Sequence, residues 1–370
     1  MTFRQYSVAT IVLFVMVCCA TMSLAAPPQA SSAGGGSYPI MSPAAEGRAR
    51  QVFELWENGQ TGALFATFAE ALKKNSGGEA KFAAYSKQLR DKMGKETKML
   101  DENMTPGMLA PQTEYGRLSQ YSKANIKVIT RIVLDEHGVV QAFMVGPEPS
   151  LPEGRYAGYQ DTAKLRLPFN GDWFVLQGGH SVFDNAYMQS EEGRFSIDFA
   201  KLKNGRPLSG DPSKNESFYC FGEPILAPAD GTVVRVENGY VDNPPGTRTQ
   251  DSPQGNLVII SHGNREFSVV DHLKQNSITV KKGDTVKQGD TIGACGNSGS
   301  SPVPHVHFQL RNSVALPPPE PLPAQFHDYV ADGKLVAVGE PIKGQTVSNA
   351  PTTGNSKPAA EPPKTEPVKK

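Results

Sequence analysis

The chain has 370 residues and no net charge at neutral pH, because 37 Lys and Arg residues balance 37 Asp and Glu residues. This length suits two domains with tails, and a hydrophobic fraction of 38% is enough for packed cores. The balanced charge excludes net charge as a drive toward nucleic acid or an anionic membrane. The 30 prolines and 36 glycines indicate many loops and a part rich in β-structure.

The N-terminus has the pattern of a secretory signal peptide. Arg4 gives a positive start, an apolar run covers residues 9–17, and small residues before Ala25 offer a cleavage site. The run is shorter than the ~20 residues of a membrane-spanning helix. A lipoprotein signal at Cys18 is an alternative, although the residue before it is not the small one that a lipobox requires. We expect a signal peptide over residues 1–25 and an exported protein, periplasmic or extracellular, with an uncleaved anchor left open.

Removal of this segment would leave two cysteines, Cys220 and Cys295. Two cysteines in an exported protein are compatible with one disulfide. Two separate buried thiols are the alternative, because the sequence does not give the distance between them.

Helical periodicity begins after a leader. Residues 26–43 are rich in Ala, Pro, Gly and Ser and predict a flexible segment. Apolar residues then recur at helical spacing, on three successive faces separated by glycines. The members of these faces are Ala49, Val52, Phe53 and Trp56, then Leu64, Phe68 and Leu72, then Phe82, Tyr85, Leu89 and Met93.

The pattern then changes to strands. Residues 126–134 are rich in β-branched side chains, residues 135–138 form a turn sequence, and residues 139–145 return as a second strand. Helices followed by strands predict a small α+β domain over residues 44–150. In its order of elements it resembles the cone-shaped domains of the nuclear-transport-factor-2 type that precede peptidase domains in some exported bacterial proteins. The sequence leaves open whether it is a spacer, an inhibitor of a cleft, a ligand-binding cup or the docking site of an envelope protein partner.

A second domain follows from about residue 165, where short β runs alternate with turns. The runs cover residues 173–176, 231–236, 257–260 and 267–270. They predict a mainly antiparallel β domain over residues 165–315. We expect a short extension over residues 316–340 and a disordered tail, rich in Pro and Lys, over residues 341–370.

The chemistry concentrates in histidines, four of the seven lying between residues 262 and 307. His305 and His307 are two residues apart, so on a strand they project to the same face. Imidazole nitrogen is a favoured zinc ligand, and a catalytic zinc site has three protein ligands and one open position. The pair therefore indicates a zinc site near the C-terminus.

In the surroundings of this pair, the chain resembles the lysostaphin/LytM-type zinc endopeptidases of bacterial cell walls. The resemblance covers roughly residues 171–315, and its segments occur in the family's order. These segments are residues 194–199, 227–234, 271–273, 280–293 and 293–311. The resemblance implies an antiparallel sheet of the duplicated-hybrid-motif type with a loop-walled groove.

The resemblance also implies roles for individual residues. Asp198 and His307 stand at positions of zinc ligands, and His272 and His305 stand at the two catalytic histidine positions. The implied cofactor is zinc, and the implied reaction is attack of zinc-bound water on a peptide bond, with imidazoles handling the protons.

The third ligand departs from the family pattern. The commonest spacing puts a histidine where this chain has Arg194, whose guanidinium stays protonated and cannot bind a cation. In the subgroup that the chain most resembles, the histidine position is filled by Tyr187. His180 follows a Gly-Gly step, as the ligand does in some members of the wider clan. We expect His180 to be the third ligand, with Tyr187 or no third protein ligand as the alternatives.

The function implied is a zinc-dependent endopeptidase that hydrolyses peptide bonds in peptidoglycan, with wall peptides as its partners and no nucleic acid. The alternative is a catalytically degenerate module that binds wall peptide or activates another wall hydrolase, because one expected ligand is displaced. The presence together of Asp198, His272, His305 and His307 favours the enzyme.

Overall fold

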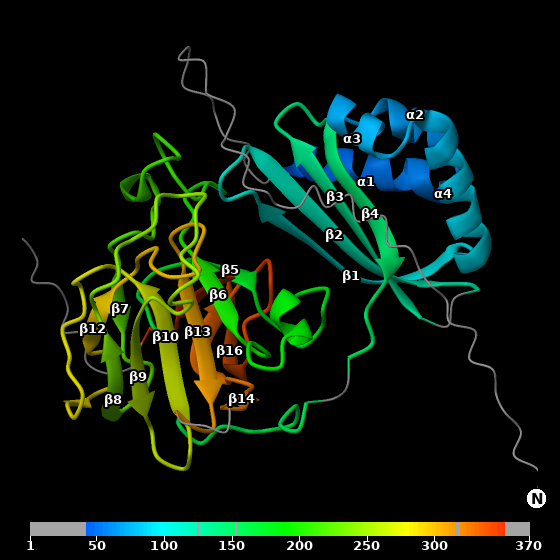
Figure 1. Cartoon of the computed structure of the whole chain (residues 1–370). Coiled ribbons are helices and arrows are strands. Elements are labelled where there is room, and N and C mark those ends of the chain that lie inside the picture. The colour runs from blue at the N-terminus through cyan, green and yellow to red at the C-terminus, as the bar shows by residue number, and fades with distance from the viewer. Residues whose placement is uncertain (1–41, 124–125, 152–153, 315–318, 352–370) are drawn as a thin grey trace, which may run out of the picture.

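The computed structural model describes residues 42–123, 126–151, 154–314 and 319–351. The predicted signal peptide, nearly all of the predicted leader and residues 352–370 lie outside these ranges. Within the described ranges, none of the helices has the length and apolar character needed to cross a membrane. Figure 1 shows two bodies joined by a long connection: a sheet with helices on one side, then a body built almost entirely of strands.

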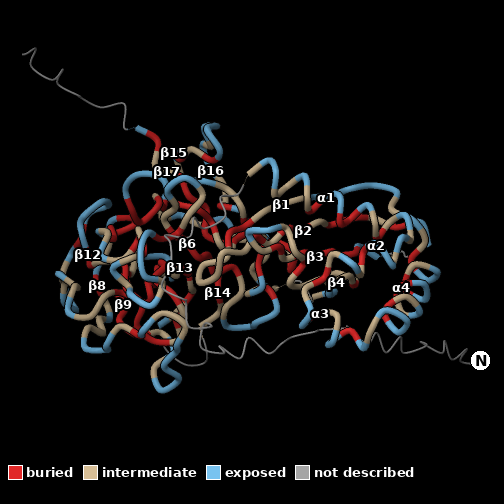
Figure 2. The backbone as a smooth tube through the Cα atoms, turned by 90° about the horizontal axis from the view of Figure 1, so that it is seen from above, coloured by how far each residue is buried: buried red, intermediate tan, exposed pale blue. Residues whose placement is uncertain are grey.

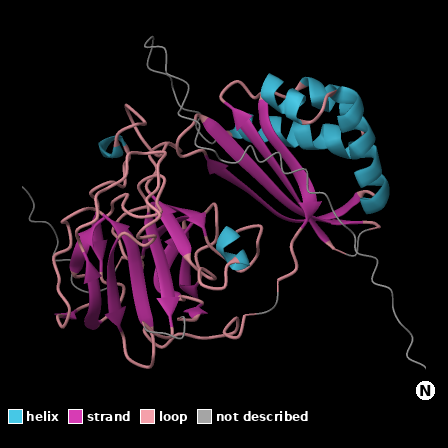
Figure 3. Ribbon diagram, viewed as in Figure 1, coloured by secondary structure: helices cyan, strands magenta, loops and turns pink. Residues whose placement is uncertain are grey.

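The N-terminal body packs four helices against an antiparallel sheet whose strands follow one another in chain order (Figure 3). The helices are α1 (Pro43–Glu57), α2 (Thr61–Ala66), α3 (Glu70–Asn75) and α4 (Glu79–Met93). The strands are β1 (Glu96–Pro106), β2 (Gln112–Tyr121), β3 (Lys127–Asp135) and β4 (Val140–Pro147). Ser42 caps α1, its Oγ accepting a hydrogen bond of 3.2 Å from the Ala45 amide.

The side of this sheet that faces the helices is filled by the domain's own side chains. The predicted apolar face of α1 is buried in full, in one core cluster with aromatic side chains from α4 and β4. The Phe68 and Phe82 rings lie 5.0 Å apart between centroids, and the Trp56 and Phe143 rings lie 5.6 Å apart. The likeness to the nuclear-transport-factor-2 type stays a prediction.

The C-terminal body is mostly antiparallel β-structure, as predicted. Its main sheet has the order β11-β8-β9-β10-β13-β6-β5-β17-β15-β16, β14 pairs with β13, and β7 and β12 form a separate pair. The longer strands of its first part are β5 (Trp173–Gln177), β6 (Ile197–Ala200), β8 (Gly231–Glu237), β9 (Asn256–Ser261), β10 (Phe267–Leu273) and β13 (Val306–Arg311). The short ones are β7 (Pro224–Leu226), β11 (Thr285–Val286), β12 (Thr291–Ala294) and β14 (Pro321–Leu322). Single turns of 3-10 helix occur at η1 (Ala186–Gln189) and η2 (Asn215–Ser217).

The sheet continues beyond the predicted end of the domain. Strands β15 (Phe326–Ala331), β16 (Lys334–Gly339) and β17 (Thr346–Asn349) lie in the predicted extension and tail. Val347 is fully buried and pairs with Trp173 of β5. The predicted boundaries at residues 316 and 341 are therefore wrong, because apolar side chains of this segment complete the core of the sheet.

Alternation along β13 separates the core from the site. Val306, Phe308 and Leu310 are fully buried in the main core. His307 and Gln309 therefore project from the opposite face. Figure 2 shows buried positions running along the strands of both sheets, with exposed positions in the loops and on the outer side of the helices.

Candidate metal centre

Three neighbouring strands bring the acidic and imidazole groups together. In the register of the sheet His307 of β13 pairs with Asp198 of β6 on one side and with Asp271 of β10 on the other. Paired residues of adjacent antiparallel strands project to the same face. Strand order thus places residues more than 100 positions apart in one row.

The imidazoles of His272, His305 and His307 converge beside this row. One ring nitrogen from each of the three imidazoles lies within 4.8 Å of the other two. Oδ1 of Asp198 lies 2.8 Å from Nδ1 of His307 and 3.7 Å from Nε2 of His305. The site therefore unites four of the five residues that the sequence singled out.

Hydrogen bonds fix the tautomers of two of these imidazoles. Nδ1 of His272 lies 2.9 Å from the carbonyl oxygen of Ser298, and Nδ1 of His305 lies 2.8 Å from that of Val303. A carbonyl oxygen only accepts, so each Nδ1 carries the proton and each Nε2 keeps its lone pair. Both Nε2 atoms are thus available as bases or metal ligands.

The backbone of His272 is also unusual, with φ at +61° beside an irregularity in the pairing of β9 and β10. A non-glycine residue in this region is held there by its surroundings and is common at functional sites. The irregularity turns the imidazole of His272 toward His305, with ring centroids 5.0 Å apart.

The buried charges of the site reinforce one another. Burial alone would raise the pKa of Asp198, but the His305 imidazole and the hydrogen bond from His307 overcome it and lower this pKa to about 2. Burial acts to lower the pKa of His307, but the bond to Asp198 raises it. Burial and the two neighbouring imidazoles hold the pKa of His272 well below its usual value. Asp198 is therefore a carboxylate and His272 a neutral base near neutral pH.

Tyr187 lies in the site, at the position where the resemblance led us to look for a histidine. Its hydroxyl donates to Oδ2 of Asp198 over 2.9 Å, and its ring centroid lies 5.1 Å from that of His307. Burial and the Asp198 charge raise the pKa of Tyr187 well above its usual value. Tyr187 therefore remains a neutral phenol, which is a hydrogen-bond donor and a poor zinc ligand.

The structure does not bring His180, the expected third ligand, into the cluster of His272, His305 and His307. Its Nε2 lies 2.6 Å from a carboxylate oxygen of Glu340, and its ring packs against Phe195 rather than joining the other imidazoles. The hydrogen bond to Glu340 raises the pKa of His180. Glu340, which follows β16 and lies 160 positions away in the sequence, thus engages Nε2 of His180.

The hydrogen-bond partners of the His272 and His305 imidazoles were not predicted from the sequence. Ser298 and Val303 supply the carbonyl groups, and Oγ of Ser301 lies 3.1 Å from Nδ1 of His305. The run of Asn, Ser and Gly before His305 was the available signal, because such residues form loops that hydrogen-bond to their neighbours. The two cysteines, Cys220 and Cys295, are buried as free thiols.

The donor set fits a zinc ion. Ligand atoms bound to one tetrahedral zinc at about 2.0–2.2 Å lie about 3.3–3.6 Å apart. Oδ1 of Asp198 lies 3.7 Å from Nε2 of His305, close to this range, and 2.8 Å from Nδ1 of His307, a hydrogen-bond distance that would have to lengthen around an ion. Carboxylate oxygen and imidazole nitrogen are also ligand types that zinc prefers.

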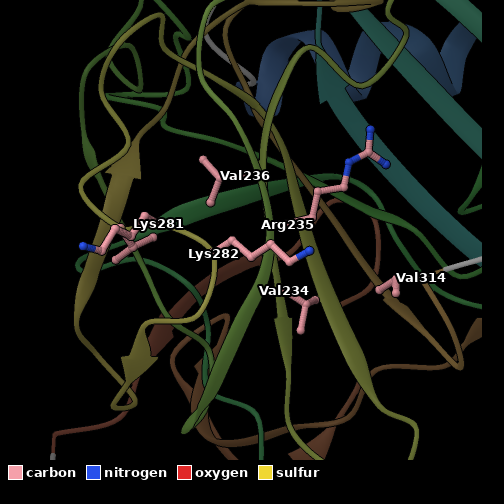
Figure 4. A pocket seen from close by; sticks show the side chains of 7 residues that line it. Val234, Arg235, Val236, Lys281, Lys282 and Val314 are labelled. Atoms are coloured by element: carbon pink, nitrogen blue, oxygen red, sulfur yellow. The ribbon is translucent and has the colours of Figure 1, made fainter.

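A separate hollow of about 400 Å³ lies along β8 (Figure 4). It is lined by Val234, Arg235, Val236, Val280, Lys281, Lys282 and Val314. None of the site residues lines it, so it is distinct from the metal centre.

Comparison with known proteins finds a family similar to part of the C-terminal body. Residues 217–318 match the family described as peptidase family M23. This range includes the three clustered histidines but begins after Asp198. An uncharacterized metalloprotease of Haemophilus influenzae is 37% identical over 180 residues, which cover 44% of this chain and 35% of the relative. The peptidoglycan DD-endopeptidase ShyA of Vibrio cholerae is 37% identical over 90 residues, covering 24% of this chain and 18% of the relative.

The chain thus spans about a third or less of the length of these curated relatives. Among solved structures, the catalytic domain of the prophage-encoded M23 protein EnpA from Enterococcus faecalis is 21% identical, with a TM-score of 0.28, over 43% of this chain and 95% of that one. The family match and the two relatives lead to one conclusion: residues 217–318, within the C-terminal β-structure of this chain, are similar to peptidase family M23.

Proposed function

We propose that this protein is a zinc-dependent endopeptidase that hydrolyses peptide bonds in bacterial peptidoglycan. The observation that carries the proposal is the convergence of Asp198 with His272, His305 and His307 on one face of β6, β10 and β13. The similarity to a peptidoglycan DD-endopeptidase favours wall peptide as the substrate class. Export by the predicted signal peptide would bring the protein to that substrate in the periplasm or outside the cell.

Asp198 and His307 would hold the ion, because Oδ1 of Asp198 and Nδ1 of His307 lie 2.8 Å apart and an ion would take the place of the proton between them. A zinc ion bound there lowers the pKa of water and polarises a carbonyl oxygen. The remaining chemistry belongs to imidazoles. His272 would accept the proton of the attacking water at Nε2, since its proton is held on Nδ1 by Ser298. The proton taken up by His272 would then pass to the leaving amine as the C–N bond breaks, and Nε2 of His305, in the same tautomer, offers a second acceptor for a proton in the site.

Tyr187 would orient Asp198 rather than bind the metal. Its hydroxyl occupies Oδ2, so Oδ1 is left to face His307 and His305. With a phenol in this place, the protein supplies fewer strong ligands than a site with three, and we expect zinc to bind less tightly than in such a site.

The same residue supports a second candidate, a catalytically degenerate module that binds wall peptide or activates another hydrolase. Such a protein would keep the groove and lose a ligand, and Tyr187 stands where the ligand is expected. The two candidates differ in whether bonds are broken, which gives a direct test.

The test uses protein without residues 1–25, supplied with zinc and incubated with purified sacculi. We expect soluble muropeptides from the wild type, none from His307→Ala, and a loss of about 10²–10⁴-fold for His272→Ala with zinc retained. If the wild type sediments with sacculi and releases nothing, and His307→Ala behaves identically, the enzyme is excluded and the binding module takes its place.

A further inference from the structure

The N-terminal sheet has two covered faces, and only one is covered by its own helices. Along β2 and β3, alternate residues such as Tyr115 and Ile132 pack beneath the helices. On the other face, Leu118 and Ile129 form a small buried cluster with Phe183. Phe183 is fully buried and belongs to the C-terminal body, in the loop between β5 and β6. This face of the N-terminal sheet therefore packs against a loop of the C-terminal body.

A glycine makes room for this ring. Gly116 of β2 pairs with Asn103 of β1 and with Arg131 of β3, so the three form one row across the sheet. A Cβ atom at Gly116 would lie 3.0 Å from Cε2 of Phe183 and 2.7 Å from Oδ1 of Asn103. Both separations are shorter than an ordinary contact, so a side chain at position 116 would displace the Phe183 ring or the Asn103 side chain. The missing side chain of Gly116 thus leaves a notch in the row, and the ring lies in it.

Polar groups of the same row hold the loop backbone and its neighbour. Nη2 of Arg131 donates to the carbonyl oxygen of Phe183 over 2.8 Å, and Nδ2 of Asn103 donates to Oδ1 of Asp184 over 3.3 Å. The guanidinium carbon of Arg131 also lies 5.6 Å from the centroid of the Phe183 ring. The loop is thus fixed by side chain and backbone together.

An ion cluster, in which Lys343 is buried and its partners are partly exposed, joins the two bodies beside this contact. Oε1 of Glu114 lies 2.6 Å from Nη1 of Arg131 and 2.9 Å from Nζ of Lys343. Lys343 follows β16 in the C-terminal body and is 8% exposed. Removing Glu114 would leave the buried ammonium of Lys343 without this partner, which is unfavourable. The contact therefore has the character of a permanent interface.

A short chain of contacts leads from Phe183 to the metal centre. Asn185 is fully buried, and its Nδ2 donates to the carbonyl oxygens of Gly179 and Ser196 over 3.1 and 3.0 Å. Its Oδ1 accepts from the amide of Tyr187 over 3.1 Å and so caps η1. Figure 3 shows this helical turn on the side of the C-terminal sheet toward the N-terminal domain. Tyr187 then donates to Asp198.

We propose that the N-terminal domain is a positioning element for the metal centre: its notched sheet holds Phe183, and Phe183 fixes the loop that sets Tyr187 against Asp198. Phe183 and Gly116 are positioning residues, since neither touches the site. This gives the domain a role other than a spacer. The inference rests on the proposed function for its zinc readout, and its exchange readout is independent of that function.

The test compares full-length variants that disturb the contact from either side. Phe183→Ala removes the ring, and Gly116→Ala fills the notch from the N-terminal domain. Phe183→Leu keeps an apolar side chain and should rescue. Gly146→Ala is the matched control, because Gly146 lies in β4 of the same sheet and a Cβ there meets nothing within 4 Å.

The readouts are hydrogen exchange of the peptide spanning residues 179–193 and zinc affinity measured against a chelator, on variants with unchanged helical circular dichroism. We expect exchange at least 10-fold faster and zinc affinity altered at least 3-fold in Phe183→Ala and Gly116→Ala. Phe183→Leu and Gly146→Ala should stay within 2-fold of the wild type. Unchanged exchange in both disturbing variants would overturn the inference. Faster exchange in a protein whose wild type binds no zinc would retain the positioning and reject the proposed metal function.

Discussion

The hydroxyl of Tyr187 donates a hydrogen bond of 2.9 Å to Oδ2 of Asp198, where the resemblance to zinc endopeptidases leads one to expect a histidine beside the aspartate. A buried phenol with a raised pKa stays neutral. The carboxylate is therefore oriented by the phenol on Oδ2, while its Oδ1 lies against His307 and faces His305. This arrangement makes the affinity for metal the property most sensitive to residue 187.

Replacing Tyr187 with histidine should add a ligand. We expect Tyr187→His to tighten zinc binding at least 10-fold, because an imidazole nitrogen is a preferred zinc ligand and a neutral phenol is not. Tyr187→Phe is the control, since it removes the hydrogen bond to Asp198 without adding a ligand. Zinc affinity is measured by competition with a chelator. Equal affinities for the wild type and Tyr187→His would show that residue 187 does not face the metal.

Removing the imidazole of His180, which contacts Glu340, should not affect zinc binding. His180 is engaged by Glu340 at 2.6 Å and lies outside the imidazole cluster. We expect His180→Ala to keep zinc content and wall hydrolysis within 2-fold of the wild type, whereas His307→Ala loses both. Metal analysis of the two purified variants checks this. Loss of zinc from His180→Ala would restore the original ligand assignment.

Asp161 gives a prediction for stability against pH. Burial raises the pKa of Asp161 from 3.8 to about 6, and its Oδ1 is buried without a hydrogen-bond partner among the described residues. Since the folded pKa exceeds the unfolded one, the folded state binds the proton more tightly. The contribution of the protonated Asp161 to the free energy of unfolding is therefore fully present below about pH 4 and is lost as pH rises through about 6.

Asp161→Asn removes this charge and keeps an oxygen that can accept from the Gln325 amide, which donates to Asp161 over 2.7 Å. We expect the variant to be more stable than the wild type by about 1–2 kcal/mol at pH 8, after allowing for solvent at this partly exposed carboxyl, with the gain shrinking toward zero at pH 4. Urea unfolding at both pH values measures it. An equal gain in stability at pH 4 and pH 8 would show that the charge of Asp161 is not the cause of the gain.

The two cysteines give a prediction about chemical reactivity. Cys220 and Cys295 are buried free thiols, and burial raises the pKa of Cys295 well above its usual value. Buried thiols of this kind are inert. In protein lacking residues 1–25, we expect a thiol reagent to modify neither cysteine in the native state and both after unfolding without reductant. Mass spectrometry counts the adducts, and no adducts after unfolding would indicate a disulfide instead.

Local pattern carried much of the prediction. The helical spacing of Ala49, Val52, Phe53 and Trp56 gave the buried face of α1 because periodicity is read within one element. The resemblance selected Asp198, His272, His305 and His307, and strand pairing brings these four together.

Long-range contacts account for what was not predicted. His180 was assigned to the metal because nothing near it in the sequence announces Glu340, 160 positions away. The strand β17 was read as tail because four residues in a Pro- and Lys-rich segment give too weak a signal, although Val347 completes the core. The packing of the N-terminal sheet against Phe183 was likewise not predicted, because it depends on how the two domains pack together.

The central claim is that a zinc ion held by Asp198 and His307 is required for cleavage of wall peptide. The most direct measurement strips the metal from the protein with a chelator, returns zinc in steps and follows the release of muropeptides from sacculi. The account predicts that stripping abolishes release, that about one zinc per chain restores it, and that zinc restores nothing in His307→Ala. Full release by the stripped protein, or restoration in His307→Ala equal to that of the wild type, would contradict it.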